Sequence, residues 1–271
     1  MEAGDNPYVE LTSAFNKGRL RAILSSGQAV VFHRLAVMSK DGDWILQEDE
    51  EALGHVLGVL GSQGAHYRFG APLDRRWLAG GWSSHLEHRA ERLRLRTDFV
   101  TRPPRLSADE LAQVWRAAES SEVPVIELEA LAEIKKTNRE KDYVVIGELA
   151  RRMETPRSQL LYSRSARDLL RLAKEHGDLA EDLAELRPVL QRIGDGRDVL
   201  EQALDSERRA LIRKNEVRLA KYREVMQGWS KIWPEVSAEI AALPLLEAHA
   251  KLVERATGVL PFAPATLGET S

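Results

Sequence analysis

The feature that most constrains the fold is a change in the character of the sequence near Pro156. Before it, short apolar segments alternate with stretches that have the period of amphipathic helices. After it, the sequence is rich in charge, helical in period and interrupted by helix breakers. These breakers are Gly177, Pro188, the Gly194-Asp195-Gly196 turn, Pro234 and Pro244. We therefore predict a domain of strands and helices over residues 1–154 and an all-helical domain over residues 155–271.

The size and composition allow two folded domains. The chain has 271 residues, of which 43% are hydrophobic and 30% charged, as in ordinary globular proteins. No segment approaches the roughly 18 to 20 apolar residues of a membrane span, and the first residues lack the basic-then-apolar pattern of a signal peptide. We therefore expect a cytoplasmic protein with no membrane partner.

Cysteine content and charge exclude several function classes. With no cysteine, the chain can have no disulfide, no thiolate zinc site and no cysteine nucleophile, whereas metals that prefer oxygen ligands remain available. The seven histidines show no spacing typical of a zinc site. The net charge of −3 argues against nucleic-acid binding through overall charge, so only a local basic patch could provide it.

Apolar periodicity predicts the elements of the first half. The segment 28–33 fits a strand or a helix by period alone. Residues 66–82 are interpreted as a hairpin with core tryptophans at 77 and 82, with the lining of a nucleotide or acceptor cleft as the alternative. The predicted helices cover residues 8–25, 48–61, 107–120 and 128–153, the last interrupted near 137, and the predicted strands cover 44–46, 93–100 and the edge segment 123–126.

Three aspartates carry the chemistry suggested by the sequence. On a strand, Asp41 and Asp43 project from the same face about 6 to 7 Å apart. Asp98 can supply a third carboxylate from another strand. Magnesium prefers hard oxygen ligands and usually takes one or two carboxylates together with substrate phosphates. Two such ions about 4 Å apart stabilise the attacking and leaving oxygens of a phosphoryl displacement.

The order of these motifs resembles the nucleotidyltransferase superfamily that includes DNA polymerase beta, in particular its small prokaryotic members. The similarity covers roughly residues 20–153 and has two departures: Ser26 stands where the turn usually begins with glycine, and Gly42 separates the paired acids where an aliphatic residue is usual. The matching segments are Ser26-Gly27, Arg34, Ser39-Lys-Asp-Gly-Asp43, Arg96-Thr-Asp98-Phe-Val, Leu128 to Lys135, and Arg139-Glu-Lys-Asp142.

The resemblance implies an α+β fold in which a mixed sheet is flanked by helices. It also implies Mg²⁺ or Mn²⁺ as cofactor and a nucleoside triphosphate such as ATP as substrate, with Asp41, Asp43 and Asp98 as metal ligands and catalytic residues. The glycine turn would start a helix at residues 28–33 and bind triphosphate. The residues it implies for nucleotide binding are Ser26, Gly27, Ser39, Lys40, Lys135 and Arg139.

The expected activity is transfer of a nucleoside monophosphate to an acceptor hydroxyl, with release of pyrophosphate. Such small prokaryotic proteins often serve in toxin–antitoxin systems, which implies a cognate toxin or antitoxin as partner. It also implies RNA, especially a tRNA end, or a protein side chain as acceptor. The alternative is a catalytically weak protein of the same fold that binds nucleotide or a partner protein. Separately, the basic residues from Arg208 to Arg223 are interpreted as a salt-bridged helix or as an RNA-binding face.

Overall fold

The structure is a computed structural model that describes residues 6–90 and 93–264. The chain forms two compact units. One contains residues 1–126 together with 219–271, and the other contains residues 127–218. The predicted boundary at 154/155 is not a boundary between these units, because the helices on either side of it pack together. The buried side chain of Met153 precedes this position, and Gln159 Nε2 donates to the Met153 carbonyl at 2.8 Å.

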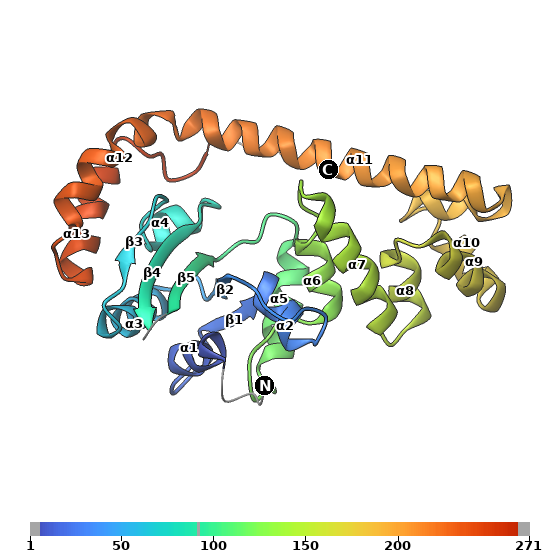
Figure 1. The fold of residues 1–271 in the computed structure, drawn as a ribbon, viewed down its shortest axis with the longest axis horizontal. Helices are drawn as coiled ribbons and strands as arrows, with labels where there is room; N and C mark the ends of the chain where they lie inside the picture. The colour runs from blue at the N-terminus through green and yellow to red at the C-terminus, as the bar shows by residue number, and fades with distance from the viewer. Residues whose placement is uncertain (1–5, 91–92, 265–271) are drawn as a thin grey trace. The chain divides into compact units, whose positions relative to one another are not determined.

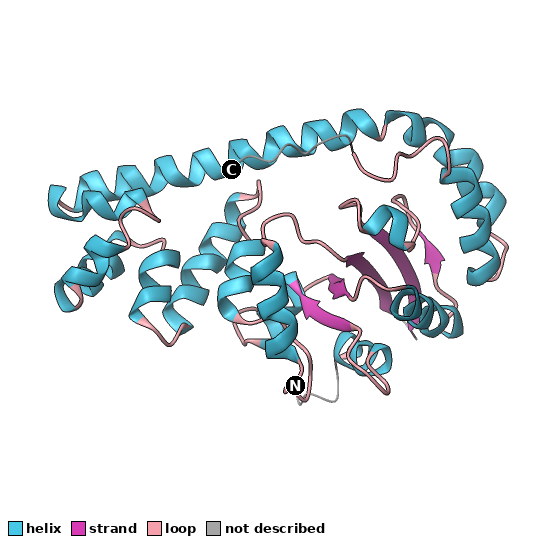
Figure 2. Cartoon of the chain, turned by 180° about the vertical axis from the view of Figure 1, so that it is seen from behind, coloured by secondary structure: helices cyan, strands magenta, loops and turns pink. Residues whose placement is uncertain are grey.

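The first unit is built on a five-stranded mixed sheet with the order β1-β2-β5-β4-β3 (Figure 1). The central pair, β2 and β5, is parallel, and the other neighbouring strands are antiparallel. The strands are β1 (Ala22–Ser25), β2 (Asp41–Leu46), β3 (His66–Tyr67), β4 (Ser84–Ala90) and β5 (Leu93–Val100). The described part of the chain has all its strands in this unit (Figure 2). The predicted α+β class, with helices flanking a mixed sheet, is therefore confirmed.

Several helices of the first unit begin at side-chain caps that the sequence provides. Asp49 accepts from Ala52 N, and Ser107 forms a capping box with Glu110, so both helices begin where the acidic first turns predicted. Residues 28–32 are helical, as the resemblance implied, and His33 is the C-cap of this helix. The helices are α1 (Pro7–Phe15), α2 (Ser26–Phe32), α3 (Glu50–Ser62), α4 (Arg75–Leu78), α5 (Ala108–Ala118), α12 (Gln227–Ile240) and α13 (Leu245–Ala256).

Three element predictions in this unit are wrong. The predicted edge strand 123–126 forms only an isolated parallel bridge from Val125 to Leu24. The helix predicted to end at residue 25 ends at Phe15, because Gly18 takes a φ of 91° and the Asn16 side chain accepts from Arg21 N and Ala22 N. The chain then enters β1, which is buried along its whole length. The predicted hairpin over residues 66–82 is instead β3 followed by the short helix α4, although Trp77 and Trp82 are buried as predicted.

One face of the sheet is an aromatic core. Trp44 of β2 stacks on Phe99 of β5, with ring centroids 5.5 Å apart, and Phe15 packs edge-on against both rings. The Trp44 indole donates to Thr12 Oγ1 at 2.9 Å, which satisfies its polar atom inside the core. Because side chains alternate between the two faces along a strand, the residues next to Trp44 and Phe99 in sequence project from the opposite face of the sheet.

Residues 219–271 complete the first unit rather than forming part of a separate helical domain. Three buried indoles form hydrogen bonds between the two sequence segments of the unit. Trp77 donates to Leu260 O at 3.0 Å, Trp82 donates to Pro261 O at 2.8 Å, and Trp229 donates to Gly70 O at 2.9 Å.

The second unit is helical throughout, in agreement with the predicted helical character of this region. The interruption predicted near residue 137 falls between its first two helices. Arg187 is buried and binds Glu207 through both Nε and Nη2, at 3.0 and 2.9 Å. The unit contains α6 (Leu128–Ile134), α7 (Glu140–Arg152), α8 (Pro156–Tyr162), α9 (Ala166–Glu175), α10 (Gly177–Asp182), the 3₁₀ segment η2 (Pro188–Asp195) and the first part of α11 (Arg197–Val225).

None of the helices in the described residues has both the length and the apolar character that a membrane crossing requires.

Candidate functional site

The three predicted aspartates lie on the two parallel strands at the centre of the sheet. Asp43 of β2 pairs directly with Asp98 of β5, and Asp41 pairs with Arg96. Directly paired residues of neighbouring strands project from the same face, and so do residues two apart on one strand. Asp41, Asp43 and Asp98 therefore share the face opposite the aromatic core. The register brings together the acids that the sequence predicted would meet.

The surroundings of Asp41 and Asp98 differ. Asp98 Oδ1 lies 2.8 Å from His85 Nδ1 and 3.3 Å from Arg68 Nη1, so this carboxylate is already held by two donors. Asp41 Oδ1 is buried and has no hydrogen-bond partner among the described residues; its nearest cation, Arg96 Nη1, is 3.6 Å away. The Asp41 side chain as a whole is 40% exposed, so Arg96 and solvent compensate part of the cost of leaving this oxygen without a hydrogen bond.

Sequence reasoning missed a chain of hydrogen bonds that runs from Ser83 through His85 to Asp98. Ser83 Oγ lies 2.9 Å from His85 Nε2, and His85 Nδ1 contacts Asp98. Gly70 leaves room for the imidazole, because a Cβ at this position would lie 2.6 Å from His85 Cδ2. The signal for β4 was weak: polar His85 and Glu87 alternate with Leu86, but the strand contains no β-branched residue.

A second charged group occupies the same face. Glu87 of β4 accepts from Arg94 at 2.6 and 2.8 Å, and His66 Nε2 lies 3.1 Å away. Burial opposes ionisation of Glu87, but the hydrogen bonds from Arg94 and His66 outweigh it and lower the pKa of this carboxyl. Arg68 Nε, 3.7 Å from Glu87 Oε2, links this group to Asp98. The network fixes several side chains around the acids.

The predicted glycine turn lies at the end of β1. Ser26 has a φ of 50°, a left-handed conformation that favours glycine, which is the residue usual at this position in the resembling family. A Cβ on Gly27 would lie 2.2 Å from Ser39 Oγ, so the turn and the segment before β2 are in close contact. Gln28 Nε2 donates to Ser39 O at 2.9 Å, and Ser39 Oγ donates to Asp41 O at 3.3 Å. The structure thus brings Ser26, Gly27 and Ser39 to the acidic strand.

Gly42 has a packing reason for departing from the family pattern. It faces the aromatic core, where a Cβ would lie 2.4 Å from Tyr8 Cδ1 and 2.5 Å from the Trp44 ring. This departure from the family pattern therefore concerns the core face of β2, and Asp41 and Asp43 still share the opposite face. Burial raises the pKa of Tyr8, and the nearby Asp41 carboxylate raises it further, so the phenol stays protonated and donates to Lys40 O at 2.8 Å.

A cavity of about 490 Å³ opens where β2 and β5 begin, a volume in the range of small-molecule sites. Its apolar lining includes Val37 and Met38, which are 86% and 77% exposed. The side chain of Lys40 is exposed and has no ion pair among the residues described. The polar lining comprises Asn6, Gln28, Ser39, Lys40, Arg94 and Arg96.

The two remaining predicted cations belong to the second unit. Lys135 is buried, with Nζ 3.7 Å from Asp142 Oδ1, and Arg139 Nε lies 2.9 Å from Asp142 Oδ2. Thr137 Oγ1 also donates to Asp142 Oδ2. In this structure Lys135 and Arg139 are thus engaged with one buried carboxylate. Their assignment to nucleotide binding stays a prediction.

The geometry of the acidic face suits a metal ion held by two of the carboxylates better than one held by all three. Within residues 6–90 and 93–264, no three His, Asp or Glu side chains are gathered closely enough to hold a metal ion. Magnesium commonly takes only one or two protein carboxylates. Asp41 and Asp43 provide two on one face, and Asp41 Oδ1, which accepts no hydrogen bond among the described residues, is an oxygen of the required type. The assignment of Asp98 as a further metal ligand stays a prediction.

Comparison with known proteins gives one distant likeness. No family model and no curated protein matches the chain. The crystal structure of a "putative nucleotidyltransferase" from H. pylori aligns with 79% of this chain and 96% of its own, at 14% sequence identity and a TM-score of 0.38. A likeness of this size carries no inference about the activity of the chain.

Proposed function

We propose that the chain is a metal-dependent nucleotidyltransferase that moves a nucleoside monophosphate from a nucleoside triphosphate to a hydroxyl of a macromolecule. The observation that carries the proposal is the direct pairing of Asp43 with Asp98 on parallel strands, with Asp41 on the same face. Three carboxylates on adjacent central strands are the arrangement that the resembling family uses. The unsatisfied Asp41 Oδ1 adds support for a cation beside it.

In this proposal Asp41 and Asp43 hold Mg²⁺ or Mn²⁺, which when bound neutralises charge on the phosphates of the nucleotide. Ser26, Gly27 and Ser39 line the turn against which the triphosphate binds, and Lys40 supplies a mobile positive charge. Asp98 orients the acceptor hydroxyl and takes its proton. His85 and Arg68 fix the position of Asp98 through the contacts described above.

We propose RNA, with a tRNA end favoured, as the acceptor, and assign acceptor binding to α11. Arg209, Arg213 and Lys214 of this helix are exposed and have no carboxylate partner among the described residues. Glu207, on the same helix, accepts from Arg187 and Arg164 and so does not neutralise these cations. The helix therefore carries cations that are free to contact phosphates.

The acceptor is tested by incubating the protein with each α-labelled nucleoside triphosphate, magnesium, and either total tRNA or a protein extract. Label on RNA that is lost when Arg209, Arg213 and Lys214 are changed to Glu supports the proposal. The matched control changes three exposed cations elsewhere in the second unit, Arg157, Arg167 and Lys174, to Glu, and it should keep the label. Label confined to protein, including this chain, would contradict the RNA assignment. A partner protein of toxin–antitoxin type would appear as an inhibitor or an activator of this labelling.

Two observations favour a second candidate, a catalytically weak protein of this fold that binds nucleotide. The Asp98 carboxylate is occupied by His85 and Arg68, and no three-residue metal cluster is formed in the described residues. Calorimetry separates the two candidates: magnesium-dependent nucleotide binding without turnover favours the second, whereas binding with turnover favours the first.

A further inference from the structure

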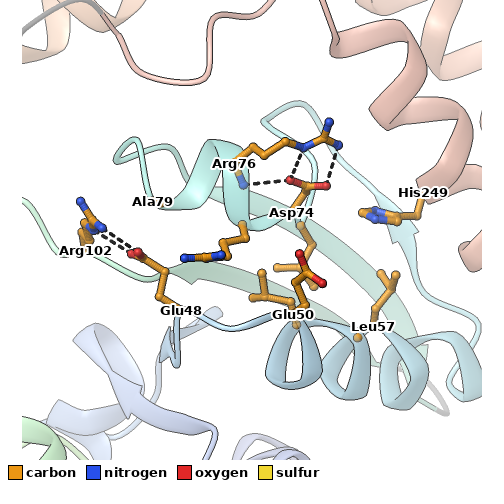
Figure 3. A pocket seen from close by; sticks show the side chains of 12 residues that line it. Glu48, Glu50, Leu57, Asp74, Arg76, Ala79, Arg102 and His249 are labelled. Carbon is orange, nitrogen blue, oxygen red and sulfur yellow. Dashed lines mark hydrogen bonds and ion pairs between the residues drawn. The ribbon is translucent and has the colours of Figure 1, made fainter.

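A cavity of about 580 Å³ lies in the first unit, away from the acidic face. It is lined by residues of α3 and α4, by the segments that follow β2 and β5, and by His249 of α13 (Figure 3). Glu48 follows β2 and Arg102 follows β5, so the same two strands carry the aspartates and border this cavity. Asp43 and Glu48 are five residues apart, roughly 16 Å along an extended chain. The cavity is therefore a separate site.

The lining has an apolar part and a charged part. Leu53, Leu57, Leu73 and Ala79 provide apolar surface. The charged part has three guanidinium groups, from Arg75, Arg76 and Arg102, and three carboxylates, from Glu48, Glu50 and Asp74. This combination of apolar walls with a few charged groups is typical of sites for small organic ligands, and 580 Å³ lies within their size range.

Two of the three arginines are neutralised within the cavity. Arg76 donates to both oxygens of Asp74 at 2.9 and 2.8 Å, and Arg102 donates to both oxygens of Glu48 at 2.7 and 2.6 Å (Figure 3). These paired carboxylates have little capacity to bind a further cation. Among the described residues, the side chain of Arg75 has no hydrogen bond and no ion pair, so its five donors are available to an anion.

His249 adds a neutral donor to this set. Its ring points from α13 towards Asp74 (Figure 3), and its Nδ1 lies 2.7 Å from the Tyr67 hydroxyl. The hydroxyl oxygen of Tyr67 accepts from Leu73 N, and burial raises the pKa of Tyr67, so the phenol proton is retained and donated to Nδ1. Burial also lowers the pKa of His249. The neutral imidazole therefore carries its proton on Nε2.

Gly54 keeps this cavity open. It lies inside α3, where glycine costs about 1 kcal/mol of helix stability relative to alanine, and it lines the cavity with no atom within 4 Å of where a Cβ would stand. A larger side chain there would extend into the cavity without displacing its neighbours. Gly58, one turn further along α3, is equally open but does not line the cavity, so it provides a matched control.

We propose that this cavity binds a small organic anion, with its anionic group on Arg75 and His249 Nε2 and its apolar body against Leu53 and Leu57. The site is independent of the proposed transferase centre. The proposed ligands share one phosphate, sulfonate or carboxylate group attached to an apolar body. Asp74 binds Arg76 and Glu48 binds Arg102, so Arg75 is the arginine that remains available to the ligand.

The test uses the full chain and the probe 8-anilinonaphthalene-1-sulfonate, which joins one anionic group to an aromatic body. We expect saturable one-to-one fluorescence enhancement with the native protein. Arg75→Gln and Gly54→Leu should each weaken binding roughly tenfold or more, the size of a lost charge-assisted contact. Gly58→Leu and Asp43→Asn should bind within about twofold of the native protein. A second titration adds benzoate and phenyl phosphate as competitors to distinguish carboxylate from phosphate preference.

Absence of saturable binding to the native protein would overturn the proposal. So would equal binding by the Arg75→Gln and Gly54→Leu variants, or a loss in Gly58→Leu as large as in Gly54→Leu. Circular dichroism of each variant verifies that its fold is retained. Since Asp43→Asn is a control for this site, failure of the transferase proposal would leave the binding result unchanged.

Discussion

At the scale of single residues, Gly42 is fixed by the core and not by the acidic site. Gly42→Val would place a branched side chain 2.4 Å from Tyr8 Cδ1. We expect the free energy of unfolding to fall by about 1–3 kcal/mol, as in other overpacked cores. Denaturant unfolding measures this, with Gly58→Ala on the open face of α3 as a control that should be neutral or stabilising. Unchanged stability of Gly42→Val would contradict the packing account.

His85 is expected to act as a positioning residue for Asp98. His85→Ala removes the donor 2.8 Å from Asp98 Oδ1, and we expect magnesium-dependent turnover to fall about 10- to 100-fold, as when other groups that orient metal-site ligands are removed. His85→Asn, whose amide can replace the Nδ1 donor, should restore part of kcat. An equal loss in both variants, accompanied by reduced stability, would indicate a purely structural role.

The order and spacing of the motifs predicted that the three acids would meet, and the register of β2 and β5 brings them to one face. Their catalytic role, and the role of the turn at Ser26 and Gly27, stay predictions. The sequence could not identify His85 or Arg68. Their importance depends on the β4–β5 register, which pairs His85 with Asp98. It also could not show that Lys135 is buried against Asp142, since its spacing fits the wet side of a helix equally well.

At the scale of elements, β4 contains a buried histidine that should make stability depend on pH. Burial, and then the charge of His66, lowers the pKa of His88 below its ordinary 6.5, and its Nδ1 has no partner among the described residues. The unfolded chain therefore binds the proton more readily. The stability that the folded protein keeps by burying His88 in its neutral form is fully present above pH 6.5, and it is lost as the pH falls below 6.5.

The measurement is the free energy of unfolding between pH 7 and pH 5. One proton gives a slope of at most about 1.4 kcal/mol per pH unit. His88→Leu should reduce the slope, whereas His176→Gln, a change at an exposed histidine, should not. Identical slopes in the native protein and His88→Leu would contradict the assignment.

Strong periodicity identified the helices α3, α5, α6 and α7, because each has a long apolar stripe or a clear capping signal. Short elements were less predictable. The four residues of β1 are too few to show a strand period, and the predicted edge segment 123–126 forms a single parallel bridge from Val125 to Leu24. Tertiary burial decides these segments more than local preference does.

At the scale of the whole molecule, residues 219–271 are required to complete the unit that carries the sheet. A fragment of residues 1–218 lacks α12 and α13, and Trp77 and Trp82 lose their hydrogen bonds to Leu260 O and Pro261 O. We expect this fragment to show red-shifted tryptophan emission and no cooperative transition in that emission, which reports on the first unit because residues 127–218 contain no tryptophan.

The matched fragment, residues 127–218, is one continuous compact unit and should retain helical circular dichroism with a cooperative transition. A native-like melting temperature for the fragment 1–218 would contradict this account. Sequence reasoning placed the boundary at 154/155 because composition changes there. It could not show that the last part of the chain returns to the first unit, since that contact depends on residues such as Trp229 and Gly70 that are far apart in sequence.

The central claim is that the acids on β2 and β5 catalyse nucleotidyl transfer. The most direct measurement is magnesium-dependent release of pyrophosphate from a nucleoside triphosphate in the presence of tRNA and protein acceptors. The account predicts release by the native protein, and a loss of roughly a hundredfold or more in Asp41→Asn, Asp43→Asn and Asp98→Asn, since each removes charge stabilisation of several kcal/mol. Asp109→Asn, a change at an exposed acid of α5, should release pyrophosphate at the native rate. Undiminished release in any two of the three variants would contradict the account, and so would the absence of release from the native protein.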